Sequence, residues 1–152
     1  MEELAMKVPG AREILEIKGV GINTVAAFIS EVGDIKNYEH PRQIQKLGGL
    51  NLVENSSGEH EGETTISKRG RRRLRSILYK VIVPIVAKNQ EFRILHEYYT
   101  TRKGNPLKKK QSLIVLCCKL IRIFFAILKK GIKYDPEKML KDIKRPSLQE
   151  VA

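Results

Sequence analysis

The sequence predicts a single, mostly α-helical domain, and three observations support this fold class. Apolar residues recur at spacings of three and four along most of the chain, glycines follow the expected helix ends, and no stretch alternates convincingly between apolar and polar residues as a half-buried strand does. At 152 residues the chain is long enough to bury a core for one domain without disulfides. We expect at most one small β-hairpin, near residues 64–66.

The first part of the chain predicts two short helices joined by a glycine turn. Residues 11–16 and 22–32 have helical spacing, and Gly33 is placed to end the second helix. Such a unit looks like a helix-hairpin-helix, in which glycines let backbone N–H groups approach a phosphate; a simple chain reversal is the alternative. The candidate DNA contacts of this unit are Gly19, Val20, Gly21, Asn23 and Thr24.

A short helix and an exposed loop come next. Pro41 suits the first residue of a helix that Gly48 and Gly49 end, and residues 51–63 are polar and rich in Ser and Glu. This loop contains the adjacent serines Ser56 and Ser57 before Gly58. Its acidic residues and histidine do not predict a metal site, because metal ligands must converge and loop spacing alone does not make them do so.

A strongly basic helix is expected after the loop. Six of the eight residues from Lys68 to Arg75 are Lys or Arg. We predict a helix from Lys68 to about Lys88, with Ser67 as its N-cap and a kink at Pro84. An apolar stripe that starts at Leu74 anchors this helix to the core, so its basic face is available to phosphates.

The rest of the chain predicts three more helices. Residues 90–103 form one that Gly104 ends, residues 111–130 form the central core helix, and a short last helix starts at Pro136. The central helix is interrupted by charges and is not expected to be a membrane anchor. It contains Cys117 and Cys118, which we interpret as small core residues in a reducing cytosol. Residues 144–152 are expected to be a loose tail.

The charge distribution favours a nucleic-acid partner. The formal net charge is +12, and the basic residues gather in segments 68–75, 102–110 and 119–133. Clustering of this kind is typical of a phosphate-binding surface, although an ordinary basic surface is the alternative. The absence of a secretory signal pattern is consistent with a cytoplasmic location. The further candidate DNA-binding side chains are Arg71, Arg73, Arg75, Lys108, Lys109 and Lys110.

A series of short motifs, in order along the chain, resembles one family. The motifs are Lys18-Gly19-Val20-Gly21, Glu31-Val32-Gly33-Asp34, Gly49-Leu50, Ser57-Gly58, Ile66-Ser67-Lys68-Arg69-Gly70, Leu74-Arg75, Gly104, Lys119-Leu120-Ile121-Arg122-Ile123 and Tyr134-Asp135-Pro136. Together they resemble the C-terminal transposase domain of the insertion-sequence 110/116/902 transposases, a group that includes the Piv-type DNA invertases. The resemblance predicts a transposase helical domain over residues 17–143, with residues 1–16 as a lead helix that ends a missing upstream segment.

The resemblance also implies a chemistry: DNA strand cleavage and rejoining, with Ser57 as the nucleophile and Ser56 beside it as the positional alternative. Cations near such a serine would stabilise the extra charge on phosphorus in the transition state, and Lys68, Arg69 and Arg72 are the candidates. A guide RNA and homo-oligomerisation of the full protein are implied as well. Magnesium is implied only for an upstream acidic domain, and no cofactor or metal for this chain. The alternatives are a non-catalytic helix-hairpin-helix module that binds nucleic acid, or an inactive transposase fragment.

Overall fold

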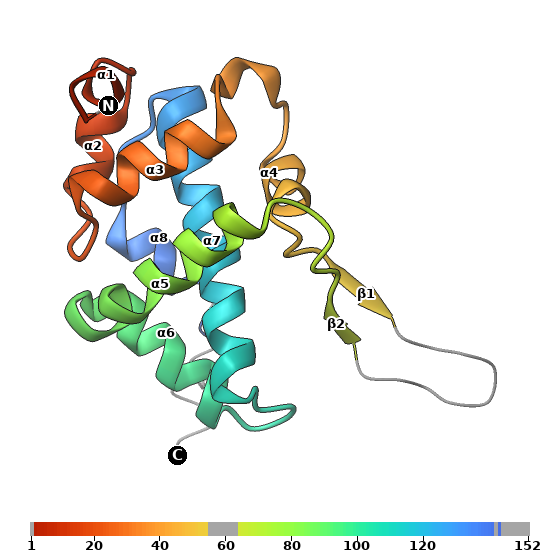
Figure 1. Ribbon diagram of the computed structural model, residues 1–152. Helices are drawn as coiled ribbons and strands as arrows, with labels where there is room; N and C mark the ends of the chain where they lie inside the picture. The colour runs from red at the N-terminus through yellow and green to blue at the C-terminus, as the bar shows by residue number, and fades with distance from the viewer. Residues whose placement is uncertain (1, 55–63, 142, 144–152) are drawn as a thin grey trace.

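A computed structural model describes residues 2–54, 64–141 and 143, and it confirms a mostly helical single domain (Figure 1). Along the chain, the elements are α1 (Glu2–Met6), α2 (Ala11–Leu15), α3 (Ile22–Val32), the 3-10 helix η1 (Ile35–Asn37), α4 (Pro41–Leu47), β1 (Leu52–Glu54), β2 (Thr64–Ile66), α5 (Arg72–Lys88), α6 (Gln90–Thr101), α7 (Lys109–Lys130) and α8 (Pro136–Leu140).

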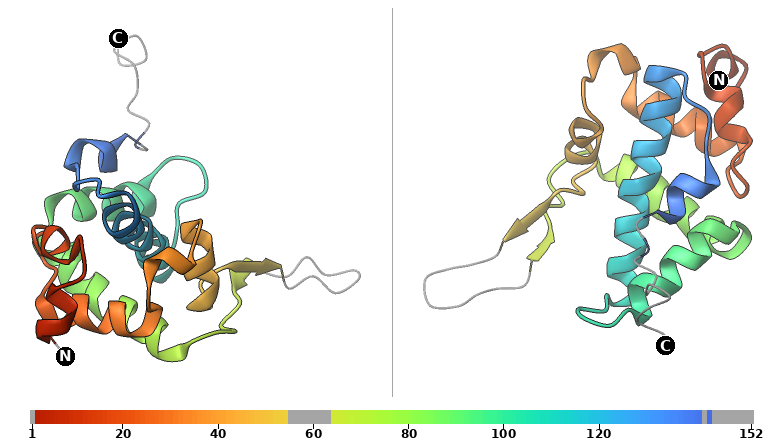
Figure 2. Two further views of the ribbon diagram at one scale, coloured as in Figure 1. Left: turned by 90° about the horizontal axis from the view of Figure 1, so that it is seen from above. Right: turned by 180° about the vertical axis from the view of Figure 1, so that it is seen from behind.

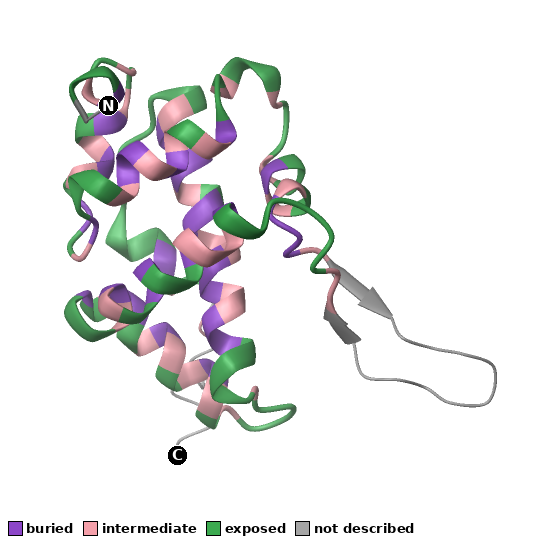
Figure 3. Ribbon diagram, in the orientation of Figure 1, coloured by how far each residue is buried: buried purple, intermediate pink, exposed green. Residues whose placement is uncertain are grey.

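Helix α7 is the centre of the fold, as its broad apolar face predicts. Helices α2, α4, α5 and α6 all pack on it, and buried positions recur along its length (Figure 3). Phe124 of α7 meets Phe28 of α3 edge to face, with 4.9 Å between the ring centroids. By length and composition α7 could also cross a membrane, but half of its most apolar stretch is buried within the domain. That burial is what a core helix requires.

Cys117 is a core residue, as expected, whereas Cys118 is half-buried against the core. Cys117 is 1 % exposed, and burial raises the pKa of its thiol far above the ordinary value. Burial also raises the pKa of Cys118 to about 11, against a smaller lowering by Arg122. Both thiols are therefore protonated at neutral pH, and neither offers the thiolate that nucleophilic or metal chemistry requires.

Helices α3 and α5 pack side by side and run in opposite directions. Gly19, just before α3, lies against Ile85 near the end of α5, while Glu31 in the last turn of α3 contacts Arg71 and Arg73 at the start of α5. The glycine turn and the arginine segment are thus at opposite ends of this helix pair.

A two-stranded antiparallel ribbon projects from the helices (Figure 2). Leu52 pairs with Ile66 and Glu54 with Thr64, which confirms the small hairpin expected near residues 64–66. Hydrogen bonds continue from the strands toward the helices: Ser67 N donates to Asn51 O at 2.8 Å, Lys68 N to Gly49 O at 3.0 Å, and Arg71 N to Leu47 O at 2.6 Å. Segments 47–51 and 67–71 therefore form a paired base between the strands and the helices, which we call the ribbon base.

The start of the basic helix was predicted wrongly. Helix α5 begins at Arg72 and not at Lys68, and Ser67 is not its N-cap. Ser67 Oγ instead donates to Asn51 Oδ1 at 2.9 Å and accepts from Arg69 N at 3.2 Å. Lys68 has φ of 55°, a left-handed conformation that no α-helical residue takes. Pairing in the ribbon base outweighs the local helix signals of this segment.

Other boundaries shift by only one or two residues. Helix α6 ends at Thr101 and not Lys103, and α7 begins at Lys109 and not Gln111. Helix α5 continues through Pro84 to Lys88. The last helix, α8, begins at Pro136 as predicted.

Candidate nucleic-acid interface

The ribbon base is closely packed around Gly70. This residue has φ of +144°, and a Cβ built on it would overlap the carbonyl oxygen of Leu47 and lie 2.9 Å from the backbone nitrogen of Gly49. Both neighbours are backbone atoms, so neither can move aside as a flexible side chain would. The glycine of the Lys68-Arg69-Gly70 motif is thus required by the close approach of two chain segments.

The candidate nucleophile, Ser57, and its neighbour Ser56 lie outside the described residues. The described chain reaches Glu54 on one side and resumes at Thr64 on the other, and these two residues are paired in register. The described residues on either side of the serine segment are therefore neighbours across the ribbon. Lys68 and Arg69 lie in the ribbon base that supports it, and both are exposed.

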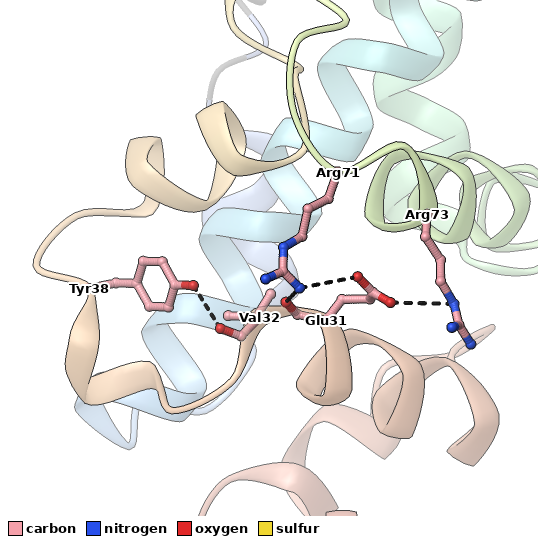
Figure 4. Close-up of polar contacts among 5 residues, drawn as sticks. All are labelled: Glu31, Val32, Tyr38, Arg71 and Arg73. Atoms are coloured by element: carbon pink, nitrogen blue, oxygen red, sulfur yellow. Dashed lines mark hydrogen bonds and ion pairs between the residues drawn. The ribbon is translucent and has the colours of Figure 1, made fainter.

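The arginines near the start of α5 divide into two groups. Arg71 and Arg73 turn toward α3 and share the carboxylate of Glu31 (Figure 4): Arg71 Nη1 lies 3.5 Å from Oε2, and Arg73 Nε lies 3.3 Å from Oε1. Arg71 Nη1 also donates to the backbone oxygen of Glu31 at 3.0 Å. The Glu31 side chain is only 14 % exposed, so it is a well-positioned partner. These contacts join α3 to the start of α5.

The side chain of Arg75 also has an internal partner, whereas no partner is seen for the guanidinium groups of Arg69 and Arg72 among the described residues. The half-buried Arg75 donates from Nη1 to the carbonyl oxygen of Gly48 at 3.1 Å and so holds the turn after α4. Arg69 and Arg72 are exposed, and within the described residues neither has an ion-pair partner. Of the clustered arginines, these two are the most available to a phosphate. Their role and those of Arg71, Arg73 and Arg75 in DNA binding stay predictions.

The two glycines of the Gly19-Val20-Gly21 turn differ in their surroundings. Gly19 has φ of +100°, and an added Cβ would lie 3.0 Å from Ile85 Cα, so this glycine lets the turn pack on α5. Nothing lies within 4 Å of a Cβ added to Gly21, which is exposed and precedes α3. Val20 is buried at 8 % exposure, Asn23 is exposed and Thr24 is half-buried. The Gly21–Asn23 side of the turn is therefore open to a ligand.

This turn does not share a site with the arginines. Gly19 contacts Ile85, which lies 13 residues after Arg72 in one helix. At 1.5 Å per residue the separation along α5 is about 20 Å. If both surfaces contact DNA, they contact different phosphates.

Lys110, in contrast, is brought close to the start of α5. Lys108, Lys109 and Lys110 are all exposed, and Lys110 lines a groove together with Arg72 and Tyr79 of α5. Glu31 was expected only as part of a family motif, and Tyr79 was not expected at the site. The contacts of Glu31 with Arg71 and Arg73 had no local sequence signal, because these partners are about forty residues away. Tyr79 had one: it lies seven residues after Arg72 and so on the same face of the basic helix.

The described residues do not form a metal centre. Within them, no group of three or more His, Cys, Asp or Glu side chains is placed to hold an ion. The magnesium that the resemblance implies for an upstream domain therefore has no fitting site in the described part of this chain. The acidic loop residues considered in the sequence analysis lie outside it.

Comparisons with known proteins support a mobile-element origin. Residues 11–99 match the family model described as the transposase IS116/IS110/IS902 family. The chain is 27 % identical over 125 residues to the insertion element IS116 uncharacterized 44.8 kDa protein of Streptomyces clavuligerus, a match that covers 82 % of this chain and 31 % of that protein. It is 37 % identical over 67 residues to the transposase for insertion sequence element IS1111A of Coxiella burnetii, covering 44 % of this chain and 18 % of that protein.

The chain thus spans about a third of the length of the IS116 protein. The family model covers more than half of the chain, from the start of α2 at Ala11 to Tyr99 in the last turn of α6. It includes the glycine turn, the ribbon base and the basic helix in one match. On this evidence the chain belongs to the IS116/IS110/IS902 transposase family.

Proposed function

We propose that this chain takes part in DNA strand cleavage and rejoining during transposition of an insertion sequence, with Ser57 as the nucleophile. The observation that carries the proposal is the ribbon base. The strands that continue from it pair Glu54 with Thr64, the described residues on either side of the serine segment. The ribbon base also presents the exposed Lys68 and Arg69, and the exposed Arg72 follows at the start of α5. These cations support the placement of a phosphate on this side of the domain.

The proposed step is a transesterification. The Oγ of Ser57 attacks a phosphodiester phosphorus, a Ser Oγ–P bond forms, and the bond from phosphorus to one deoxyribose oxygen breaks. The proton of the serine hydroxyl ends on that leaving oxygen, so no water or energy source is consumed, and the reverse reaction rejoins a strand. Lys68, Arg69 and Arg72 stabilise the charge that develops on the equatorial phosphoryl oxygens.

The wider assembly is proposed on the family resemblance. In the complete transposase, this chain would form the C-terminal part and would follow an upstream acidic domain that binds magnesium. The complete protein would act in the cytoplasm as a homo-oligomer. It would use a guide RNA to choose its DNA partners. The Gly21–Asn23 side of the glycine turn is proposed to contact phosphate in the manner of a helix-hairpin-helix.

A trapped covalent intermediate tests this function. The chain, alone and joined to the acidic domain, is incubated with a duplex from the element's end that carries a nick beside the cleavage position. The leaving fragment then diffuses away, and a phosphoserine link stays on the protein. Mass spectrometry should map the link to Ser57; Ser57→Ala should abolish it, and the matched variant Ser56→Ala should keep it.

Binding measurements complete the test. Ser57→Ala should bind the same duplex as the wild type does, because the hydroxyl contributes little to affinity. A link that maps to Ser56 would show that Ser57 is not the nucleophile. Specific duplex binding by both protein forms with no link on either would favour the non-catalytic nucleic-acid-binding function instead.

A further inference from the structure

A groove of about 480 Å³ lies between the ribbon base, α5 and α7. We call it the Tyr79 groove. Its apolar walls come from Leu50, Ile66, Ile114 and Cys117, and its polar and aromatic lining from Arg72, Arg75, Ser76, Tyr79, Lys80 and Lys110. The volume lies within the range of small-ligand sites.

Tyr79 has an exposed ring that the fold does not account for. Its neighbours on the inner side of α5, Leu78 and Ile82, are fully buried, whereas Tyr79 is 37 % exposed. It is one of only five large apolar side chains that are this exposed in the described part of the chain. An aromatic ring at the mouth of an apolar groove can stack against a flat partner.

All the charged residues that line the groove are cationic. Arg75 is held by Gly48, which leaves Arg72, Lys80 and Lys110. None of these three has an ion-pair partner among the described residues, and no Asp or Glu lines the groove. Glu31 forms ion pairs with Arg71 and Arg73 on the side of α5 that faces α3, and it forms none with Arg72. The Arg72 side chain can therefore bind a ligand in the groove. The charge therefore complements an anionic ligand.

An exposed ring, apolar walls and three cations together match one kind of ligand, an unpaired nucleotide. Its base has a free π-face to stack on Tyr79, and its flanking phosphates can reach the cations. A nucleotide within a duplex cannot use the groove in this way, because both faces of its base are already stacked. A purely apolar partner, such as a helix of a second copy, would leave the three cations unpaired.

We propose that the Tyr79 groove binds one unpaired nucleotide of a DNA strand, with the base on Tyr79 and the phosphates on Arg72, Lys80 and Lys110. The inference rests on the proposed function for its choice of DNA. The groove is partly walled by Leu50 and Ile66, at the foot of the ribbon that holds the serine segment.

Fluorescence of 2-aminopurine provides a direct test. The base is placed at the centre of a 15-nucleotide thymine strand, and the full chain is titrated in. Stacking on Tyr79 should quench the fluorescence, and Tyr79→Ala should abolish the quenching and weaken binding about 5- to 100-fold. Tyr79→Phe keeps the ring and should bind within about twofold of the wild type. Val83→Ala, which changes an exposed apolar residue one turn further on α5 but outside the groove, is the matched control.

The role of the groove cations is tested by comparing two lysines of α7, one that lines the groove and one that does not. Lys110→Gln should weaken single-strand binding several-fold, whereas Lys130→Gln, at the opposite end of α7, should change it little. Circular dichroism of each variant verifies the fold. The proposal is overturned if Tyr79→Ala binds the single strand as the wild type does, if it loses duplex and single-strand binding equally, or if a uridine RNA strand of the same length binds tightly while DNA does not. Loss of a dimer in sedimentation of Tyr79→Ala, with unchanged DNA binding, would assign the groove to a second copy.

These outcomes are separable from those for the serine chemistry. Tyr79 is not among the residues proposed to act on phosphorus, so a failed stacking test leaves the covalent-link test intact. Duplex binding that persists in Tyr79→Ala would likewise support the DNA partner while rejecting the groove.

Discussion

Arg71 holds Glu31 by two contacts, one to the backbone and one to the side chain. Its Nη1 donates to the Glu31 carbonyl oxygen at 3.0 Å and lies 3.5 Å from the carboxylate oxygen Oε2. The backbone contact falls near the end of α3, where carbonyl groups lack helical partners. Arg71, the residue before α5, thus joins the last turn of α3 to the start of α5.

Replacement of this arginine should lower stability by a modest amount. Arg71→Gln removes the ion pair and weakens the carbonyl contact, and we expect a loss of about 0.5–1.5 kcal/mol in the free energy of unfolding, because the Arg71 side chain is more than half exposed. Urea denaturation measures it. Arg72→Gln, one residue later and without such a partner, should change the free energy of unfolding by less than about 0.5 kcal/mol. Equal losses in the two variants would contradict the division of the arginines.

The two glycines of the first turn should respond differently to the same substitution. Gly19→Ala forces a left-handed φ on alanine and brings its Cβ to 3.0 Å from Ile85 Cα, so we expect a loss of about 1–3 kcal/mol. Gly21→Ala has open space and an extended φ of −102°, and should be nearly neutral. Thermal denaturation compares the two variants. If Gly21→Ala nevertheless weakens duplex binding, the turn approaches DNA closely at that residue.

Stability should depend on pH through His96. Its Nδ1 shares a hydrogen bond of 2.8 Å with the buried Ser112 Oγ, which joins α6 to α7. Burial lowers the pKa of His96, and the charge of Lys109 adds to this, against a smaller raising by Glu97. The folded state thus binds this proton less readily than the unfolded state does.

The contribution of neutral His96 should therefore be complete above its ordinary pKa of about 6.5 and fall as the pH drops from there toward the lowered folded value. Urea denaturation from pH 5 to pH 8 measures this. The non-titrating variant His96→Asn should lose less stability between pH 7 and pH 5 than the wild type. If the wild type gained stability relative to His96→Asn as the pH fell from 7 to 5, the result would contradict a lowered pKa of His96.

The helices could largely be predicted from the sequence, because their signals are local. The spacing of Val25, Ala26, Ile29 and Val32 defines α3 at the bounds that the structure has, and the start at Pro41 does the same for α4. The start of α5 could not be predicted in this way. Ser67 and the basic run look like a capped helix locally, but pairing with residues 47–51 draws them into the ribbon base. That contact joins segments about twenty residues apart, and no periodicity reports it.

The candidate site was predictable as a composition but not as an arrangement. Six basic residues in eight indicate a phosphate surface, yet nothing in the run distinguishes Arg71 and Arg73 from Arg69 and Arg72. The distinction comes from Glu31, which folding brings from forty residues away. Lys110 and Arg72 line the same groove because α5 and α7 pack together in the folded chain, and this neighbourhood is likewise not visible in the sequence.

The salt dependence of duplex binding most directly tests the claim that the unpaired arginines hold phosphates. If about five basic residues neutralise phosphates, log affinity should fall with log salt at a slope of roughly −4 to −5. Arg69→Ala with Arg72→Ala should make the slope shallower by about 2 and leave the domain folded, because both side chains are exposed. Arg71→Gln with Arg73→Gln should change the slope by less than about 1, because Glu31 already offsets part of their charge. A slope near zero in the wild type, or one that only the Arg71 and Arg73 pair controls, would contradict this account.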